Sequence, residues 1–154
     1  AGARVLADDQ LAIRRRPGGV MVSGCDGNIR LTDKSERHFL AEPIEAAPLD
    51  FAGVLKKEVG LGRLVDAMPF EDRAASRLYF PFVGTRFEIR AVSPRVAVGR
   101  ILDSVAAAHR FAGPADQMDL VGLIAAFVEP LSCADLELSP DLSVMPRVVQ
   151  EITG

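Results

Sequence analysis

The feature that most constrains the fold is a pair of consecutive helices predicted over residues 94–129. Ser93 can cap the first helix with its hydroxyl oxygen, and Pro94 suits the first helical position because its fixed φ is already helical. Gly113-Pro114 predicts the end of this helix. Its residues place one continuous apolar stripe along the core side: Val98, Ile101, Leu102, Val105, His109 and Ala112.

The second helix of the pair, residues 115–129, is apolar nearly all round after Met118. A helix of that kind is buried on most sides or lies in an interface. Because the turn between the helices is short, we expect a helical hairpin with antiparallel packing. Residues 94–129 are therefore the predicted contact surface for a second copy of the chain or for a protein partner.

Two strand regions precede the helices. Residues 78–92 alternate apolar and polar side chains in their second half, which is typical of a strand with one buried face. Residues 20–32 alternate around Asp26-Gly27, and an Asp-Gly pair favours tight turns, so we predict a hairpin there. The predicted sheet lines a core or a cavity with five apolar residues: Val20, Val22, Ile29, Phe87 and Ile89.

The other segments give shorter elements. Residues 3–16 fit a helix or a strand, and Pro17-Gly18-Gly19 ends that segment. Asp33 or Ser35 can cap a short helix that runs to Leu40. We further expect a helix over residues 51–60 capped by Asp50, a polar helix over residues 71–78, a strand over residues 135–138 and a short helix after Pro146.

The chain length of 154 residues suits one domain, so residues 1–154 are predicted to fold as a unit. The expected class is α+β. A small antiparallel sheet with short connecting helices occupies residues 19–92, a helical hairpin occupies residues 93–130, and residues 131–154 form a C-terminal extension.

Charge and composition narrow the classes of function. The net charge of −3 excludes a uniformly basic nucleic-acid binder, and residues 101–154 carry 2 basic against 8 acidic residues. No apolar run approaches the roughly 18 residues of a membrane span, and no leader pattern opens the chain. Cys25 and Cys133 belong to no metal or redox motif, which favours a reducing compartment, by default the cytoplasm.

No catalytic constellation is visible in the sequence. The two histidines, His38 and His109, lack metal-ligand spacing, and no nucleophile motif or phosphate-binding loop is complete. We therefore assign no catalytic residue and no metal site, and the sequence does not identify a cofactor. The residues to inspect first as a ligand-binding group are Cys25, His38, Tyr79 and Arg86.

The run GVMVSGCDGNIR, residues 19–30, resembles the opening of a PAS domain, in which two strands joined by an Asp-Gly turn precede a small helix. The resemblance extends over residues 19–92, where short helices and then a strand follow, and residues 69–73 look like the acidic-Arg start of a PAS connecting helix. It implies a sensor domain. PAS domains usually finish with three antiparallel strands, whereas only one is clear here, and no cofactor residue can be carried over.

Three hypotheses follow. The first is a non-enzymatic regulatory or ligand-sensing domain that acts through dimerisation or partner contact by residues 94–129. The second is an adaptor or structural subunit of a larger assembly, with residues 115–129 and the acidic C-terminal third as contact surfaces. The third is a small enzyme whose site assembles only in three dimensions.

Overall fold

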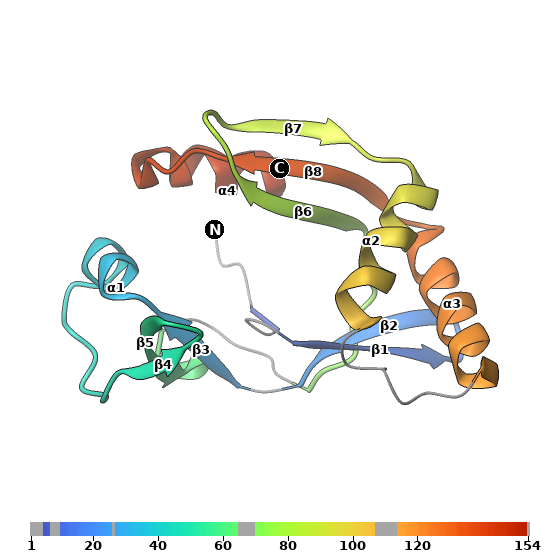
Figure 1. The fold of residues 1–154 in the computed structure, drawn as a ribbon, viewed down its shortest axis with the longest axis horizontal. Coiled ribbons are helices and arrows are strands. Elements are labelled where there is room, and N and C mark those ends of the chain that lie inside the picture. Colours follow the sequence, from blue (N-terminus) through green and yellow to red (C-terminus); the bar gives the residue numbers. More distant parts are fainter. Residues whose placement is uncertain (1–4, 7–9, 26, 65–69, 107–113, 154) are drawn as a thin grey trace. The chain divides into compact units, whose positions relative to one another are not determined.

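The computed structural model describes all residues except 1–4, 7–9, 26, 65–69, 107–113 and 154, and it confirms the α+β class (Figure 1). The chain forms two compact units. The first contains Ala1–Arg14 and Met21–Arg73, and the second contains Arg15–Val20 and Ala74–Gly154. The division into residues 19–92, 93–130 and 131–154 stays a prediction.

The first two strands form a hairpin. β1 (Leu11–Arg16) pairs with β2 (Gly19–Gly24) in a two-stranded sheet. Gly18 and Gly19 have φ values of 98° and 136°, in the region that side chains disfavour, so the glycines make this turn accessible. Residues 11–16 are thus a strand, and the predicted stop after them is a hairpin turn.

The predicted hairpin over residues 20–32 is wrong in its pairing. β3 (Asn28–Leu31) pairs with β5 (Val54–Gly60) in an antiparallel register that places Ile29 opposite Val59. β2 takes β1 as its partner instead, because the Pro-Gly turn brings β1 back along it. β2 and β3 therefore lie in different sheets, and Asp26 lies outside the described residues.

The predicted helix over residues 51–60 is also wrong. β4 (Leu49–Phe51) and β5 form a tight antiparallel hairpin that completes the sheet order β3-β5-β4. Ala52 and Gly53 occupy the turn with φ values of 53° and 84°, and Oδ1 of Asp50 accepts a hydrogen bond from the Gly53 amide at 2.7 Å. Asp50 therefore stabilises a turn of the type that joins hairpin strands.

Helix α1 (Asp33–Phe39) confirms the predicted short helix before Leu40. Its N-cap is Thr32, whose side-chain oxygen accepts from the Ser35 amide at 3.2 Å. The polar helix predicted over residues 71–78 is wrong. Arg73 is extended and exchanges two backbone hydrogen bonds of 2.8 Å with Val22, and the next strand begins at Arg77.

The second unit contains a mixed sheet in the order β6-β8-β7 (Figure 1). β6 (Arg77–Val83) and β7 (Glu88–Ala91) confirm the strand region predicted over residues 78–92. They do not pair with each other, because β8 (Ser132–Leu138) lies between them, parallel to β6 and antiparallel to β7.

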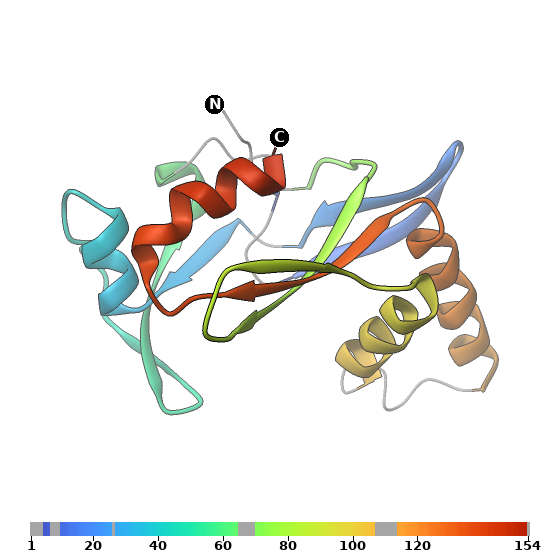
Figure 2. The ribbon, with the colours of Figure 1, turned by 90° about the horizontal axis from the view of Figure 1, so that it is seen from above.

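Three helices complete this unit. α2 (Pro94–Ala106) and α3 (Pro114–Val128) confirm the predicted helix pair, and they pack against each other. His109, Ala112 and the predicted helix end at Gly113 lie outside the described residues. α4 (Met145–Thr153) confirms the C-terminal helix. α2 and α4 lie on opposite faces of the sheet (Figure 2), where Arg100 of α2 pairs with Asp135 and Arg147 of α4 stacks on Phe87.

Each unit has its own apolar core. In the first unit the core residues are Val22, Val59 and Leu61; in the second they include Ala97, Ile124, Val128, Leu136 and Val148. The five residues expected to line one sheet fall instead in β2, β3, β7 and the turn before β7. Short 3₁₀ turns at Leu61–Arg63 and Leu142–Val144 complete the described elements.

Candidate functional site

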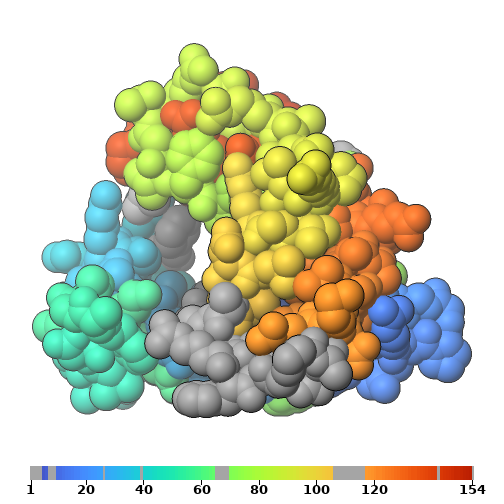
Figure 3. Space-filling view, turned by 45° about the vertical axis from the view of Figure 1, so that its right-hand side comes forward, coloured from blue at the N-terminus to red at the C-terminus, as the bar shows by residue number. Residues whose placement is uncertain are grey.

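The outer face of α3 is apolar and exposed. Met118 is 72% exposed and Val121 is 39% exposed, and the exposed Gly122 and Ala125 continue the same face one turn further along. The opposite face of the helix enters the core through Ile124, Phe127 and Val128. We call Met118, Val121, Gly122 and Ala125 the α3 stripe. Figure 3 shows α3 (orange) and α2 (yellow) side by side at the surface.

A basic hairpin tip flanks the α3 stripe within the same unit. A Cβ atom on Gly122 would lie 3.8 Å from Nη2 of Arg15, so this side chain reaches the middle of the helix. Arg15 and Arg16 also line a hollow of about 370 Å³ near the end of α3, together with Gly19, Val20, Ala126, Glu129 and Pro130. Apolar surface and exposed guanidinium groups therefore adjoin.

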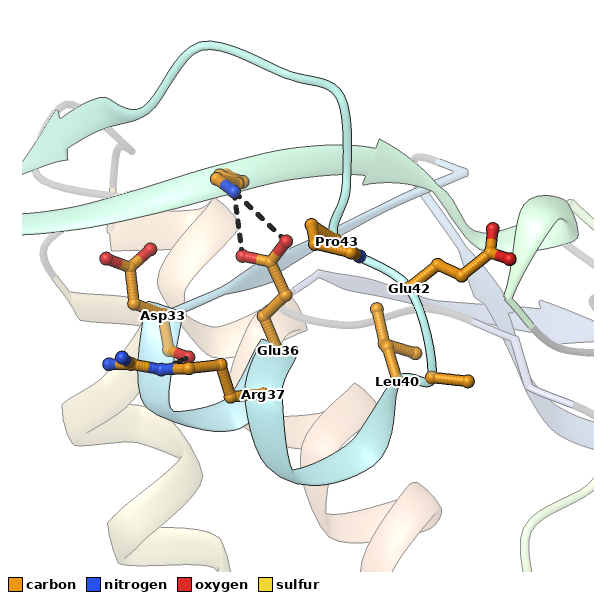
Figure 4. A pocket seen from close by; sticks show the side chains of 8 residues that line it. Asp33, Glu36, Arg37, Leu40, Glu42 and Pro43 are labelled. Carbon is orange, nitrogen blue, oxygen red and sulfur yellow. Dashed lines mark hydrogen bonds and ion pairs between the residues drawn. The ribbon is translucent and has the colours of Figure 1, made fainter.

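The first unit contains a hollow of about 390 Å³ between α1, the segment that follows it, and β5 (Figure 4). Its lining is mixed in charge: Asp33, Glu36, Arg37, Leu40, Ala41, Glu42, Pro43 and Lys57. In Figure 4, Asp33 and Arg37 lie together at one end, while Glu42 points away at the other. The volume falls in the range of ordinary small-molecule pockets.

Glu36 and Lys57 form the most buried ion pair in the described part of the chain. Nζ of Lys57 lies 2.9 Å from Oε2 and 3.0 Å from Oε1 of Glu36, whose side chain is 6% exposed. The backbone amide of Ile44 donates to the same carboxylate, and Nζ of Lys57 donates to the Ile44 carbonyl at 3.3 Å. The hydrogen bond from Lys57 and then that from Ile44 hold the pKa of Glu36 below its ordinary value. The ion pair thereby connects α1 with β5 and with the segment around Ile44.

Charged residues also occupy the α2 face of the sheet in the second unit. Arg100 donates to both carboxylate oxygens of Asp135 from Nη1 and Nη2, and it stacks on Phe80, 5.1 Å from the ring centre. This contact lowers the pKa of Asp135 and raises that of Arg100. On the same strand, Glu137 accepts from the Thr85 amide at 2.9 Å, which lowers its pKa. These contacts hold α2 and the turn before β7 against β8.

The four residues singled out from the sequence are divided between the two units. Cys25 follows β2 and is exposed, and His38 is exposed on α1, both in the first unit. Tyr79 is half-buried in β6 and lines a hollow with Arg77 and Ile152, and Arg86 is exposed in the turn before β7, where it pairs with Glu88 at 2.6 Å. Neither a ligand-binding group nor an enzyme site made of these four residues gains support from their placement.

Both cysteines are free, and burial raises the pKa of Cys133, which keeps its thiol neutral. Among the residues that the structure describes, no group of three histidine, cysteine or acidic side chains is placed to hold a metal ion. None of the described helices is both long and apolar enough to cross a membrane.

Sequence reasoning missed the pair of Glu36 and Lys57. The two residues lie far apart in the chain and are joined only when β5 passes α1, so no local spacing reveals them. It also missed Arg100 and Asp135, although an arginine on the polar edge of a predicted helix was visible.

No family model matches this chain, and no curated protein or solved structure matches it either.

Proposed function

We propose that this protein is a non-enzymatic regulatory domain that acts by contact with another protein through the α2–α3 pair. One observation carries the proposal: the α3 stripe is apolar and exposed on a helix whose opposite face is fully engaged in the core. Contiguous apolar surface of this kind typically marks an interaction site. A constitutive adaptor role is the same contact without regulation.

The chemistry beside the stripe indicates the kind of partner. Arg15 reaches Gly122, and Arg16 borders the hollow at the end of α3. A complementary partner segment therefore carries apolar side chains for the stripe and carboxylates for the arginines. A helix laid along α3 meets both needs, because its apolar residues recur at the same spacing.

The test is site-specific photo-crosslinking on the full chain. A photoreactive residue at position 118 is compared with one at position 47, an exposed site outside the α2–α3 pair, in an extract of the source cells. We expect one stoichiometric partner captured at position 118, lost on adding the V121E substitution and kept with the control D119K. Equal capture at both positions, or capture unaffected by V121E, would overturn the proposal.

A second candidate function is favoured by the hollow beside α1. Its volume of about 390 Å³ and its mixture of an apolar floor with Asp33, Arg37 and Glu42 suit a small polar ligand. The PAS-like sensing role expected for residues 19–92 belongs to this candidate and rests on the sequence resemblance and this hollow. The comparison of native with denaturing mass spectrometry is its test, because a retained ligand adds mass only in the native spectrum.

A cytoplasmic location is part of the same proposal. It rests on the two free thiols, which are typical of a reducing compartment.

A further inference from the structure

The strand β7 forms one edge of the sheet in the second unit, and β8 is its neighbour on the inner side (Figure 1). An edge strand presents a row of backbone donors and acceptors that can pair with another strand. One hydrogen bond identifies the residues of β7 whose backbone groups point outward. The Val92 amide donates to the Cys133 carbonyl at 2.8 Å.

Hydrogen-bonding direction alternates along an antiparallel strand. Because the backbone amide of Val92 points toward β8, the backbone amides and carbonyls of Arg90 and Glu88 also point toward β8. Those of Ile89 and Ala91 point the other way, toward the open edge of the sheet. A second antiparallel strand must therefore bond to Ile89 and Ala91. For two identical strands related by a two-fold axis, this restricts the pairing to registers centred on one residue of β7: Glu88, Ile89, Arg90 or Ala91. The register centred on Ala91 places Arg90 opposite Val92 and so forms no charge pair.

The charges on β7 separate these registers. With Ile89 opposite its own copy, Glu88 of each chain faces Arg90 of the other, which gives two opposite-charge pairs. A register centred on Arg90 places two arginines face to face, and one centred on Glu88 places two glutamates face to face. Like charges directly opposite each other destabilise a strand pair. The sequence Glu-Ile-Arg is therefore complementary to itself in one register.

From this self-complementary edge we propose that two copies of the chain associate through antiparallel pairing of β7 with β7, centred on Ile89, into a continuous six-stranded sheet. The side chains involved are partly exposed: Ile89 is 38% exposed, and the side chains of Glu88 and Arg90 are 32% and 51% exposed, with Oε2 of Glu88 itself buried. The α3 stripe takes no part in this pairing.

The pairing extends existing interactions on the two faces of the sheet. On the α2 face, Arg90 lies 3.5 Å from Glu137 and Arg86 lies 2.6 Å from Glu88, so the new contacts join two alternating charge rows. On the α4 face, the two Ile89 side chains meet at the two-fold axis. An interface of one short strand from each copy is small, so the dimer is a weak one that appears at high protein concentration.

The first test locates the register with cysteines in the full chain carrying Cys25→Ser. Ile89→Cys places two thiols opposite each other at a Cα separation of about 5.5 Å, which a disulfide spans. Ala91→Cys is the matched control, because its two copies lie about 13 Å apart in the same register. We expect oxidation to give a covalent dimer with Ile89→Cys and little with Ala91→Cys. Equal yields at the two positions, or no dimer at either, would overturn the proposal.

The second test uses charge. E88R and R90E each place like charges opposite each other in a homodimer, so we expect self-association roughly a hundredfold weaker than in the wild type. Mixing the two variants restores both pairs, so sedimentation velocity should show a heterodimer. Variants that stay monomeric when mixed, while circular dichroism shows them folded, would contradict the pairing. The V121E variant should dimerise like the wild type, which separates this surface from the proposed α3 contact.

Discussion

Gly84 leaves the space that the carboxylate of Glu137 occupies, and any side chain on Gly84 would overlap that carboxylate. Oε1 of Glu137 accepts from the amides of Thr85 at 2.9 Å and Arg86 at 3.4 Å. The turn between β6 and β7 is thus folded around a carboxylate that β8 supplies.

Gly84→Ala should therefore lower the free energy of unfolding by about 1–3 kcal/mol, the usual range for an overpacked site. In a Glu137→Ala background the same substitution should cost much less, because the clash is gone. Gly62→Ala is the control, since a Cβ there has no neighbour within 4 Å. Urea titrations of the four variants and the wild type measure the coupling, and additive effects would contradict this account.

The stability of the protein should fall in acid. Hydrogen bonds from Lys57, Arg100 and the Thr85 amide, respectively, lower the pKa values of Glu36, Asp135 and Glu137. A folded-state pKa below the unfolded one gives stability that is complete above the unfolded value, 4.5 for glutamate and 3.8 for aspartate, and lost as the pH falls through the folded value.

These three groups should leave the free energy of unfolding unchanged from neutral pH down to about pH 5. Below about pH 5 the free energy of unfolding should decline. Urea unfolding at a series of pH values measures it. Lys57→Met should reduce the acid-dependent part, because Glu36 then loses the donor that lowers its pKa most. An identical decline in the wild type and in this variant would contradict the role of the ion pair.

The turn between β4 and β5 holds a residue that suits it poorly. Ala52 has φ of 53°, where asparagine and glycine are tolerated better than alanine. Ala52→Asn should raise the free energy of unfolding by about 0.5–1 kcal/mol. Ala47→Asn, an exposed position without positive φ, should change it little. Thermal and urea unfolding would detect the difference. Equal effects at both sites would contradict the claim that the positive φ of Ala52 costs stability.

The two faces of α3 should respond differently to truncation. Ile124 is 1% exposed, so Ile124→Ala should cost about 2–5 kcal/mol through lost burial and the cavity left behind. Val121→Ala on the α3 stripe should cost less than about 1 kcal/mol, as expected at an exposed site. If Val121→Ala proves as costly as Ile124→Ala, the stripe is part of the core and the proposed contact surface is wrong.

Local signals predicted α1, α2, α3 and α4, but they also predicted two helices, over residues 51–60 and 71–78, that the structure does not contain, and they paired β2 with the wrong strand. The Ser93 cap and the 3.6-residue period identify α2 within one stretch of chain. Asp50 shows why the same reasoning fails nearby. Its side chain accepts from the amide three residues on, which is the bond that a helix cap makes, so only the positive φ of Ala52 and Gly53 distinguishes turn from helix.

The candidate surfaces follow the same division. The apolar character of residues 115–129 predicted a buried or interfacial helix. The structure shows one buried face and one exposed apolar face, and a partner for the exposed face stays a prediction. The charged pairs could not be predicted, because Glu36 meets Lys57, and Arg100 meets Asp135, through contacts between distant segments. The pairing of Leu78 with Cys133 is equally non-local.

The central position of β8 has a consequence for how the chain folds. β8 lies between β6 and β7 but is synthesised after both, so neither earlier strand has its partner until residue 138 has emerged from the ribosome. Non-local pairing of this kind is slow, because the loop must close before the contacts form. The sheet β3-β5-β4 has all its strands much earlier. During synthesis, the first unit should therefore be protected from proteolysis well before the second, whose exposed strands are the part of the nascent chain most in need of a chaperone.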